Sequence, residues 1–395
     1  MYNLELIGRK NKIFHKDILD NFNLINERLL GTRIMVVGGA GSIGQAVTIE
    51  LLKFKLKALH IVDISENNMV ELVRKIRSTI GYFDTEFKTF AIDSGAIEFK
   101  ALINSEKGYD YVFNLSALKH VRSEKDPFTL MRLITVNIFN TIDNIKLFRK
   151  KGLKKYFCVS TDKAANPANM MGGSKKIMEL FLNRESQKTI ISTARFANVA
   201  FSDGSLLHGF NQRLLNNHPI SAPKDIKRYF ILPEESGQLC LMSGVLGKNR
   251  NIFFPKLDKN INLVSFADIA RSYLRLKGFE PYECETEEKA RLMTRKLIKN
   301  KKWPCFFFDS DTTGEKAVEE FYTSSEKIDN SQYEDIGIIL NKIDFNSQIL
   351  DEFDTGISEL KSKGNWNKSD ITKLFHSILP NFMHIERDKF LDDRM

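Results

Sequence analysis

The side chains best suited to chemistry lie in one short stretch, Thr161-Asp162-Lys163, followed by Met171 and Lys175. This stretch combines a hydroxyl, a carboxylate and two amines with a thioether. Lys175 comes four residues after Met171 in a segment with a helical pattern, so the two side chains share one helix face. A thioether cannot accept or release a proton. Proton transfer at this face would therefore depend on the hydroxyl, the carboxylate and the amines.

A glycine-rich turn lies between an apolar strand candidate, residues 33–37, and a helix candidate that begins near residue 42. Two spacings fit the turn, Gly39-x-Gly41-x-x-Gly44 and Gly38-x-x-Gly41-x-x-Gly44. Glycines at such a turn let the backbone approach a pyrophosphate held at the helix N-terminus. The predicted dinucleotide site at this turn involves Gly38, Gly41, Ser42, Ile43 and Gly44.

Two aspartates end the strands that follow the glycine turn, and they indicate which dinucleotide binds. Asp63 comes nineteen residues after Gly44, where a carboxylate accepts hydrogen bonds from the adenosine ribose and repels a 2′-phosphate. This favours NAD over NADP, although Ser65 could accommodate a phosphate. Asp93 and the adjacent Ser94, after the third strand, are expected near the adenine ring. A glycine turn and strand-end aspartates that bind no ligand remain the alternative.

The elements that position these residues follow from short apolar runs that alternate with amphipathic helical stretches between residues 33 and 196. This alternation predicts repeated βαβ units and therefore a Rossmann-type, doubly wound parallel sheet of the α/β class. In such a sheet, ligands bind at the carboxyl ends of the strands. The expected strands are residues 33–37, 58–62, 89–92, 111–115, 156–160 and 190–196.

The pattern loosens after about residue 200, which indicates a second, smaller and mostly helical lobe that binds the substrate. Beyond residue 200, residues 262–276 read as a strand and a helix, residues 280–302 as helix-prone, and residues 303–308 as a strand. Residues 331–395 are expected to be mostly helical. The predicted division is a helical extension (1–30), an NAD-binding Rossmann domain (31–200 plus about 234–275) and the substrate-binding lobe (201–233 plus 276–395).

Composition excludes several classes of function. The chain has 42% hydrophobic residues and a net charge of +9, but no dense basic block with interleaved aromatics, so we expect no nucleic-acid partner. The seven histidines form no HxH or HExxH pair, so we expect no metal. The four cysteines are widely spaced, as in a cytoplasmic protein with reduced thiols. We expect neither a signal peptide nor an integral membrane segment.

The stretch around residues 161–175 closely resembles a known family motif. The stretch is similar to the motif of the nucleotide-sugar 4,6-dehydratases. That motif is Ser-Thr-Asp-Lys-Ala, then Asn-Pro, then Tyr or Met, then Lys. These dehydratases form the polysaccharide-biosynthesis (CapD-like) branch of the extended short-chain dehydrogenase/reductase superfamily. Relatives in this branch often carry Met in place of the usual Tyr. The matching residues are Asp162, Lys163, Ala164, Asn166, Pro167, Met171 and Lys175.

The resemblance covers most of the chain. Ala117-Leu118-Lys119-His120-Val121 looks like the family loop that lines cofactor and sugar, and Arg195-Phe196-Ala197-Asn198-Val199 looks like its Arg-Phe-Gly-Asn-Val segment. Arg228 matches an arginine that meets the substrate diphosphate, and Gly314-Glu315-Lys316 matches an element at the nucleotide ribose. The resemblance implies that Ser116, Ala117, Lys119 and Lys175 bind the cofactor. It implies that the substrate contacts are Lys119, His120, Asn198, Ser205, Arg228 and Glu315.

The resemblance also implies a reaction. A dehydratase of this kind uses NAD to oxidise C4 of a nucleotide-linked N-acetylglucosamine, removes the C5 proton, expels the C6 hydroxyl as water and returns the hydride to C6. Lys163 is then the C5 base, Asp162 the acid at C6, and Thr161 orients the C4 hydroxyl. With Met171 inert, we expect Asp162 to take the C4 hydroxyl proton as well and to deliver it to the C6 oxygen.

Several points stay open at this stage. The resemblance favours a UDP-linked sugar, but GDP remains possible, and C5 stereochemistry is unassigned. The C-terminal residues resemble those of dehydratases in legionaminic acid or bacillosamine-type synthesis, and relatives are commonly homodimers or higher oligomers. The alternatives are a nucleotide-sugar 4-epimerase, which shares fold and cofactor, and a non-catalytic NAD-binding scaffold.

Overall fold

The computed structural model describes residues 4–257, 263–384, 386, 387 and 389. Its centre is a nine-stranded sheet in the order β15-β16-β11-β6-β5-β4-β1-β2-β3. The strands from β3 to β11 pair in parallel, whereas β16 pairs antiparallel with β11 and β15 antiparallel with β16. The strands are β1 (Arg33–Val37), β2 (Ala58–Asp63), β3 (Glu86–Ala91), β4 (Tyr111–Asn114), β5 (Lys155–Thr161), β6 (Ile190–Phe196), β11 (Asn251–Pro255), β15 (Ile328–Asp329) and β16 (Ile336–Leu340).

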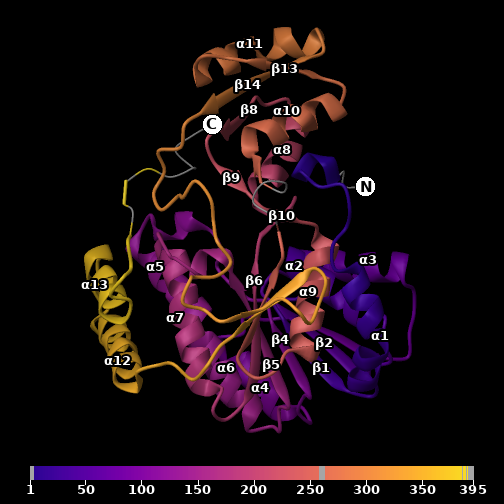
Figure 1. Ribbon diagram of the computed structural model, residues 1–395, viewed down its shortest axis with the longest axis vertical. Helices are drawn as coiled ribbons and strands as arrows, with labels where there is room; N and C mark the ends of the chain where they lie inside the picture. The colour runs from indigo at the N-terminus through magenta and orange to yellow at the C-terminus, as the bar shows by residue number, and fades with distance from the viewer. Residues whose placement is uncertain (1–3, 258–262, 385, 388, 390–395) are drawn as a thin grey trace.

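Helices cover both faces of this sheet (Figure 1). Each face of the sheet has its own apolar cluster, and the helices that contribute to a cluster pack against that face. One face carries α1 (His15–Leu29), α2 (Ser42–Leu51), α3 (Glu66–Thr79) and α9 (Pro233–Leu246). The other carries α4 (Ile97–Ser105), α5 (Pro127–Ile134), α6 (Asn140–Arg149) and α7 (Met170–Glu185), with α12 (Ser347–Lys363) and α13 (Lys368–Ile378) packed outside α7 and α5.

A smaller lobe lies beyond the carboxyl ends of the parallel strands, at the top of Figure 1. Its sheet has the order β13-β14-β8, and its apolar cluster includes Trp303 and Tyr273. Two short strand pairs, β7 with β10 and β9 with β12, lie between the lobes. The elements are β7 (Asn198–Val199), α8 (Leu206–Leu215), β8 (Ile220–Pro223), β9 (Lys227–Arg228), β10 (Phe230–Ile231), β12 (Val264–Ser265), α10 (Phe266–Leu276), β13 (Glu280–Glu283), α11 (Glu287–Lys299) and β14 (Lys302–Phe308).

The predicted fold class is confirmed: the chain forms a Rossmann-type, mostly parallel α/β sheet. The strands at residues 33–37 and 190–196 end where the sequence predicts. The third strand was predicted too late and too short, because β3 spans Glu86–Ala91 and Ile92 lies outside it. Polar residues alternate along β3, so its first half lacks the apolar run that marked the other strands.

The expectation that residues 331–395 are mostly helical is wrong at the start of this segment, because Ile336–Leu340 form strand β16 and the first helix begins at Ser347. Residues 385, 388 and 390–395 of this segment lie outside the described residues. A short apolar run does not distinguish a buried strand from a helix turn. Since β15 and β16 belong to the nine-stranded sheet, assigning all of residues 276–395 to the substrate lobe was also wrong. Residues 280–283 are likewise a strand before α11 begins. The other domain boundaries remain proposals.

The N-terminal extension is tied to the sheet by a buried ion pair. Arg9 is 4% exposed and Glu235, in the first turn of α9, is 1% exposed. Arg9 Nη1 donates to Glu235 Oε2 at 2.6 Å, and the Ile13 backbone N–H donates to Glu235 Oε1 at 3.0 Å. Helix α1 then packs against α9. The ion pair therefore links the segment that precedes α1 to the core.

Among the described residues, no helix combines the length and the apolar character that crossing a bilayer would need.

Replacing Arg9 with Met should lower the free energy of unfolding by about 3–5 kcal/mol, because Glu235 would keep a buried charge without its cation. Urea unfolding followed by circular dichroism measures this. Lys12→Met is the matched control, since Lys12 pairs with Glu234 in solvent and an exposed pair contributes at most about 1 kcal/mol. Equal losses for the two variants would contradict the prediction.

Candidate active site

Thr161, Asp162 and Lys163 form a compact hydrogen-bonded group where β5 ends. Asp162 Oδ1 accepts from Thr161 Oγ1 at 2.9 Å, from the Lys163 backbone N–H at 2.8 Å and from Lys163 Nζ at 3.2 Å. Asp162 is 3% exposed, whereas Thr161 and Lys163 are partly exposed. A buried carboxylate is thus in direct contact with an amine that solvent or a ligand can reach.

A second carboxylate faces the same amine from the loop after β14. Glu319 Oε1 lies 4.0 Å from Lys163 Nζ and 3.9 Å from Arg228 Nη2. Burial raises the pKa of Glu319, as does the nearby Asp162 carboxylate, against the opposing charges of Lys163, Arg228 and Lys316. The site therefore holds an amine between two buried carboxyl groups.

Met171 and Lys175 both lie on helix α7, and both side chains are buried. Met171 is 4% exposed and belongs to the apolar cluster on this face of the sheet. Lys175 Nζ donates to the Val159 carbonyl at 3.1 Å, and burial lowers the pKa of Lys175. A Cβ on Gly172 would lie 2.6 Å from the Lys163 carbonyl oxygen, so only glycine lets α7 pack this closely.

The glycine turn forms a tight cradle between β1 and α2. Gly38 has φ +75°, and a Cβ there would lie 2.6 Å from the Ser116 nitrogen after β4. A Cβ on Gly44 would lie 2.2 Å from the Gly38 carbonyl oxygen. Gly41 is different: its nearest neighbour would be Gly38 O at 3.7 Å, so one side of the turn stays open. The backbone can therefore be approached there, as binding a pyrophosphate requires.

Asp63 lies at the end of β2 and holds the glycine turn. Its Oδ2 accepts from the Ala40 backbone N–H and its Oδ1 from the Ser65 backbone N–H, both at 2.9 Å. A carboxylate has further lone pairs for ribose hydroxyls. The Ser65 hydroxyl caps α3 by accepting from the Asn68 backbone N–H at 3.3 Å, so in this structure it serves the helix.

The remaining predicted cofactor residues line the neighbouring strand ends. Asp93 follows β3, with Oδ1 accepting from the Gly95 N–H at 2.8 Å and Oδ2 3.3 Å from Arg132. Ser94 is buried. The Ser116 N–H donates to Asn114 Oδ1 at 3.1 Å beside Ala117. Asp93 is thus paired with the guanidinium of Arg132, a contact that the sequence did not predict.

Ser42 and Lys119 meet on a residue that sequence reasoning missed, Asp203. Ser42 Oγ donates to Asp203 Oδ2 and accepts from the Asp203 N–H, both at 2.9 Å, and Lys119 Nζ donates to the Asp203 carbonyl at 2.9 Å. A Cβ on Gly204, which has φ +70°, would lie 2.9 Å from the His120 ring. The loop at residues 203–204 therefore lies over the N-terminus of α2 and touches both predicted substrate residues of the β4 loop.

The other predicted substrate residues lie in or near the short strands between the lobes. Arg228 Nη1 donates to the carbonyls of Lys316 at 2.8 Å and Ala317 at 3.2 Å, and Nη2 lies 3.5 Å from Glu315 Oε1. Arg228 thus holds the loop that follows β14. Asn198, which begins β7, is partly buried, and the Ser205 hydroxyl caps α8.

Two polar networks support the site, and only single members of them stood out in the sequence. Asn137 Nδ2 donates to the Leu118 carbonyl and to Ser174 Oγ, both at 3.0 Å, which ties the β4 loop to α7. Arg195 pairs with Glu179 at 2.7 Å, and Glu179 accepts from Ser160 Oγ at 2.6 Å. Buried polar networks of this kind fix the strand end that carries Asp162.

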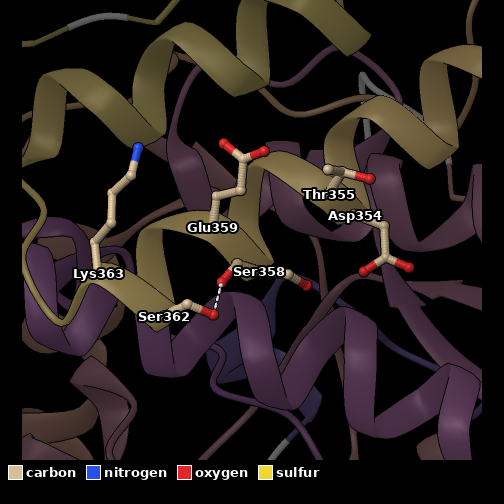
Figure 2. A pocket seen from close by; sticks show the side chains of 6 residues that line it. All are labelled: Asp354, Thr355, Ser358, Glu359, Ser362 and Lys363. Atoms are coloured by element: carbon tan, nitrogen blue, oxygen red, sulfur yellow. Dashed lines mark hydrogen bonds between the residues drawn. The ribbon is translucent and has the colours of Figure 1, made fainter.

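A surface pocket of about 540 Å³ is lined by none of these residues. Figure 2 shows the side chains that line it. These side chains all project from the single helix α12 and none belongs to the group described above. The pocket is lined by Asp354, Thr355, Ser358, Glu359, Ser362 and Lys363.

The fold and the strand-end site define a Rossmann-type α/β protein, and two solved structures share this fold. Pen from Bacillus thuringiensis matches with a TM-score of 0.66 and 21% identity, over 80% of this chain and 90% of that one. The dTDP-glucose 4,6-dehydratase DesIV from Streptomyces venezuelae, solved with NAD bound, matches with a TM-score of 0.56 and 14% identity, over 73% and 87%.

More particularly, the chain belongs to the family described as polysaccharide biosynthesis protein, whose profile matches residues 34–341. Capsular polysaccharide biosynthesis protein CapD of Staphylococcus aureus is 28% identical over 260 residues, 65% of this chain and 42% of CapD. UDP-glucose 4-epimerase of Rickettsia bellii is 28% identical over 231 residues, 56% of this chain and 65% of the epimerase. The chain thus spans less than half the length of CapD.

Gly44→Ala should destabilise the protein by about 1–3 kcal/mol, because its methyl group must displace the backbone at Gly38. Gly41→Ala adds the same methyl group where nothing lies closer than 3.7 Å, so it should change stability by less than about 0.5 kcal/mol. Chemical denaturation of both variants measures the difference. A larger loss for Gly41→Ala would mean that the turn is packed differently.

Proposed function

We propose that this protein is an NAD-dependent 4,6-dehydratase that acts on a nucleoside-diphosphate-linked N-acetylglucosamine. The observation that carries the proposal is the Asp162–Lys163 pair, a buried carboxylate 3.2 Å from an amine at the carboxyl end of β5. Dehydration of a sugar needs a base for a carbon-bound proton and an acid for the departing hydroxyl. The pair supplies one of each, and membership of a polysaccharide biosynthesis family supports this class of substrate.

NAD is the cofactor that the cradle fits. Gly38 and Gly44 leave no room for a Cβ, the turn is open beside Gly41, and Asp63 stands at the end of the next strand. The DesIV structure, which contains NAD, shares this fold. The adenosine ribose would bind at Asp63, the pyrophosphate at Gly41 and Ser42, and the nicotinamide ribose at Lys175.

The chain's own residues would divide the proton transfers between them. When bound, NAD supplies the acceptor for the C4 hydride and its return to C6. Asp162 takes the C4 hydroxyl proton, which Thr161 orients, and later gives it to the C6 oxygen as water leaves. Lys163 removes the C5 proton and returns it to C5 after C6 is reduced. The protons balance, so Met171 needs no role in proton transfer.

Finer assignments rest on the resemblance alone. We take UDP as the nucleotide, with GDP as the other candidate, and the product as a precursor of a legionaminic acid or bacillosamine-type sugar. His120, Asn198, Ser205, Arg228 and Glu315 would contact this substrate. A homodimer is the proposed assembly and the cytoplasm the proposed location.

A 4-epimerase is the second candidate, and the similarity to UDP-glucose 4-epimerase of Rickettsia bellii favours it. An epimerase moves one hydride and one hydroxyl proton and has no use for a C5 base. The Asp162–Lys163 pair therefore favours dehydration over epimerisation. The products of the two reactions differ in mass by one water molecule. A non-catalytic scaffold would give no product.

Purified protein incubated with UDP- and GDP-N-acetylglucosamine in parallel should convert one of them to a 4-keto-6-deoxy sugar, detected by mass spectrometry and NMR. Asp162→Asn should lower turnover by about 10²- to 10⁴-fold. It should also prevent reduction of bound NAD, because Asp162 accepts the C4 proton. If this variant still oxidised C4 but released no water, Asp162 would act at C6 only. An epimer of unchanged mass would identify the epimerase instead.

Met171→Leu should retain turnover within about threefold, because a buried aliphatic side chain of similar volume replaces an inert one. Steady-state kinetics of the dehydration measure this. Met171→Tyr should bring no large gain either. A loss of turnover in the Leu variant as severe as in Asp162→Asn would show that the thioether takes part in the chemistry.

A further inference from the structure

Glu319 is the buried carboxyl group of the site that the proposed mechanism leaves unused. It is 3% exposed and lies in the loop after β14, outside any helix or strand. Within the part of the chain that the structure describes, Glu319 Oε2 has no hydrogen-bond partner, and its nearest cation is Lys316 Nζ at 3.7 Å. Leaving a buried carboxyl oxygen without a hydrogen bond is unfavourable for folding. This cost indicates that its position serves another purpose.

The loop that carries Glu319 is held firmly against the catalytic strand end. A Cβ on Gly314, which has φ +65°, would lie 2.4 Å from the Asn169 side chain, and Asn169 Nδ2 donates to the Gly314 carbonyl at 2.9 Å. Lys316 Nζ donates to the Asn166 carbonyl. Arg228 donates to two further carbonyls of the loop. Glu319 is therefore fixed in place before any substrate binds.

The amine of Lys163 lies between two carboxyl groups that come from separate elements. Asp162 Oδ1 is 3.2 Å and Glu319 Oε1 is 4.0 Å from Nζ. Where solvent exposure is low, opposite charges at such distances attract each other more strongly than they do in water. Asp162, however, must gain and lose a proton during the proposed reaction. Glu319 takes no part in that proton transfer, so above its pKa its carboxylate keeps a negative charge beside Lys163 throughout turnover.

We propose that Glu319 is a positioning residue for Lys163, whose carboxylate stabilises the ammonium that forms when Lys163 removes the C5 proton. This inference rests on the proposed function. In that step the C5–H bond breaks, its electron pair remains as the enolate of the 4-ketone, and the proton goes to Nζ. Glu319 forms no bond and changes no oxidation state.

The inference predicts a pH dependence with a defined sign. Burial, followed by the charge of Asp162, raises the pKa of Glu319, whereas Lys163, Arg228 and Lys316 lower it. As the pH falls, Glu319 thus loses its charge earlier than an ordinary glutamate does. Below the raised pKa it is protonated and cannot stabilise the ammonium. The acid limb of the kcat profile should therefore reflect Glu319.

The test is Glu319→Gln, which keeps the side-chain shape and removes the charge. We expect kcat to fall tenfold to a hundredfold with KM changed less than threefold, because C5 deprotonation slows while substrate binding persists. Reduced NAD should accumulate on the enzyme, since C4 oxidation precedes the slowed step. The kinetic isotope effect with 5-deuterated substrate should increase. The part of the acid limb that belongs to Glu319 should disappear.

Two further variants separate charge from structure. Glu320→Gln makes the same change at an exposed neighbouring residue whose side chain accepts from Asn166, and it should stay within twofold of wild type. Glu319→Asp keeps the charge and should recover at least part of kcat and the acid limb. It also serves as the test if Glu319→Gln does not fold.

The inference is overturned if Glu319→Gln keeps wild-type kcat, raises only KM, or loses kcat without accumulating reduced NAD. It is also overturned if Glu319→Asp is no more active than Glu319→Gln. The proposed function fails separately, and visibly, if the wild-type protein forms no 4-keto-6-deoxy product from either nucleotide sugar.

Discussion

The proposed catalytic group and the glycine turn depend on the parallel pairing of β1, β4, β5 and β6. Parallel pairing brings their carboxyl ends to one edge, and there the glycine turn after β1, the loop after β4 and the Thr161–Lys163 turn after β5 adjoin one another. The close contact of Gly172 with Lys163 adds the helix that follows. A side chain at position 172 would collide with the Lys163 carbonyl oxygen and force α7 away from this turn.

Charge that is buried at this edge is organised in pairs and networks. The Arg195–Glu179–Ser160 network fixes the body of β5 and β6, and the Asp162–Lys163–Glu319 group begins just where the strand ends. The first network has its hydrogen bonds satisfied and is a structural support. The second leaves a carboxyl oxygen without a hydrogen bond and an amine partly exposed. The difference between these two arrangements separates a scaffold from a reactive site.

The parts of this structure that were predictable from the sequence are those with local signals. Strand β1, the glycine turn and the Asp162–Lys163 pair each carry a pattern within a few residues, and the fold class followed from their order. Ile336–Leu340 was misjudged because a short apolar run has no period that separates strand from helix. Asp203 was missed, and Glu319 was expected only beside the Gly314-Glu315-Lys316 element and not at Lys163, because the residues that they contact, Ser42 and Lys163, lie more than 150 residues away in the chain. Contacts between residues so far apart in the chain produce no pattern in the local sequence.

The antiparallel strand β16 protects one edge of the sheet against aggregation. It covers β11, whose five residues are all buried, and is followed at the margin only by the two-residue β15. An uncovered, apolar strand edge is a template for edge-to-edge aggregation. Strands β15 and β16, which follow the second lobe in the chain, therefore cover the edge of β11 and protect it from pairing with other chains. Protein truncated before residue 328 would expose the apolar edge of β11 and would be prone to aggregate, even though all of the predicted site residues would still be present.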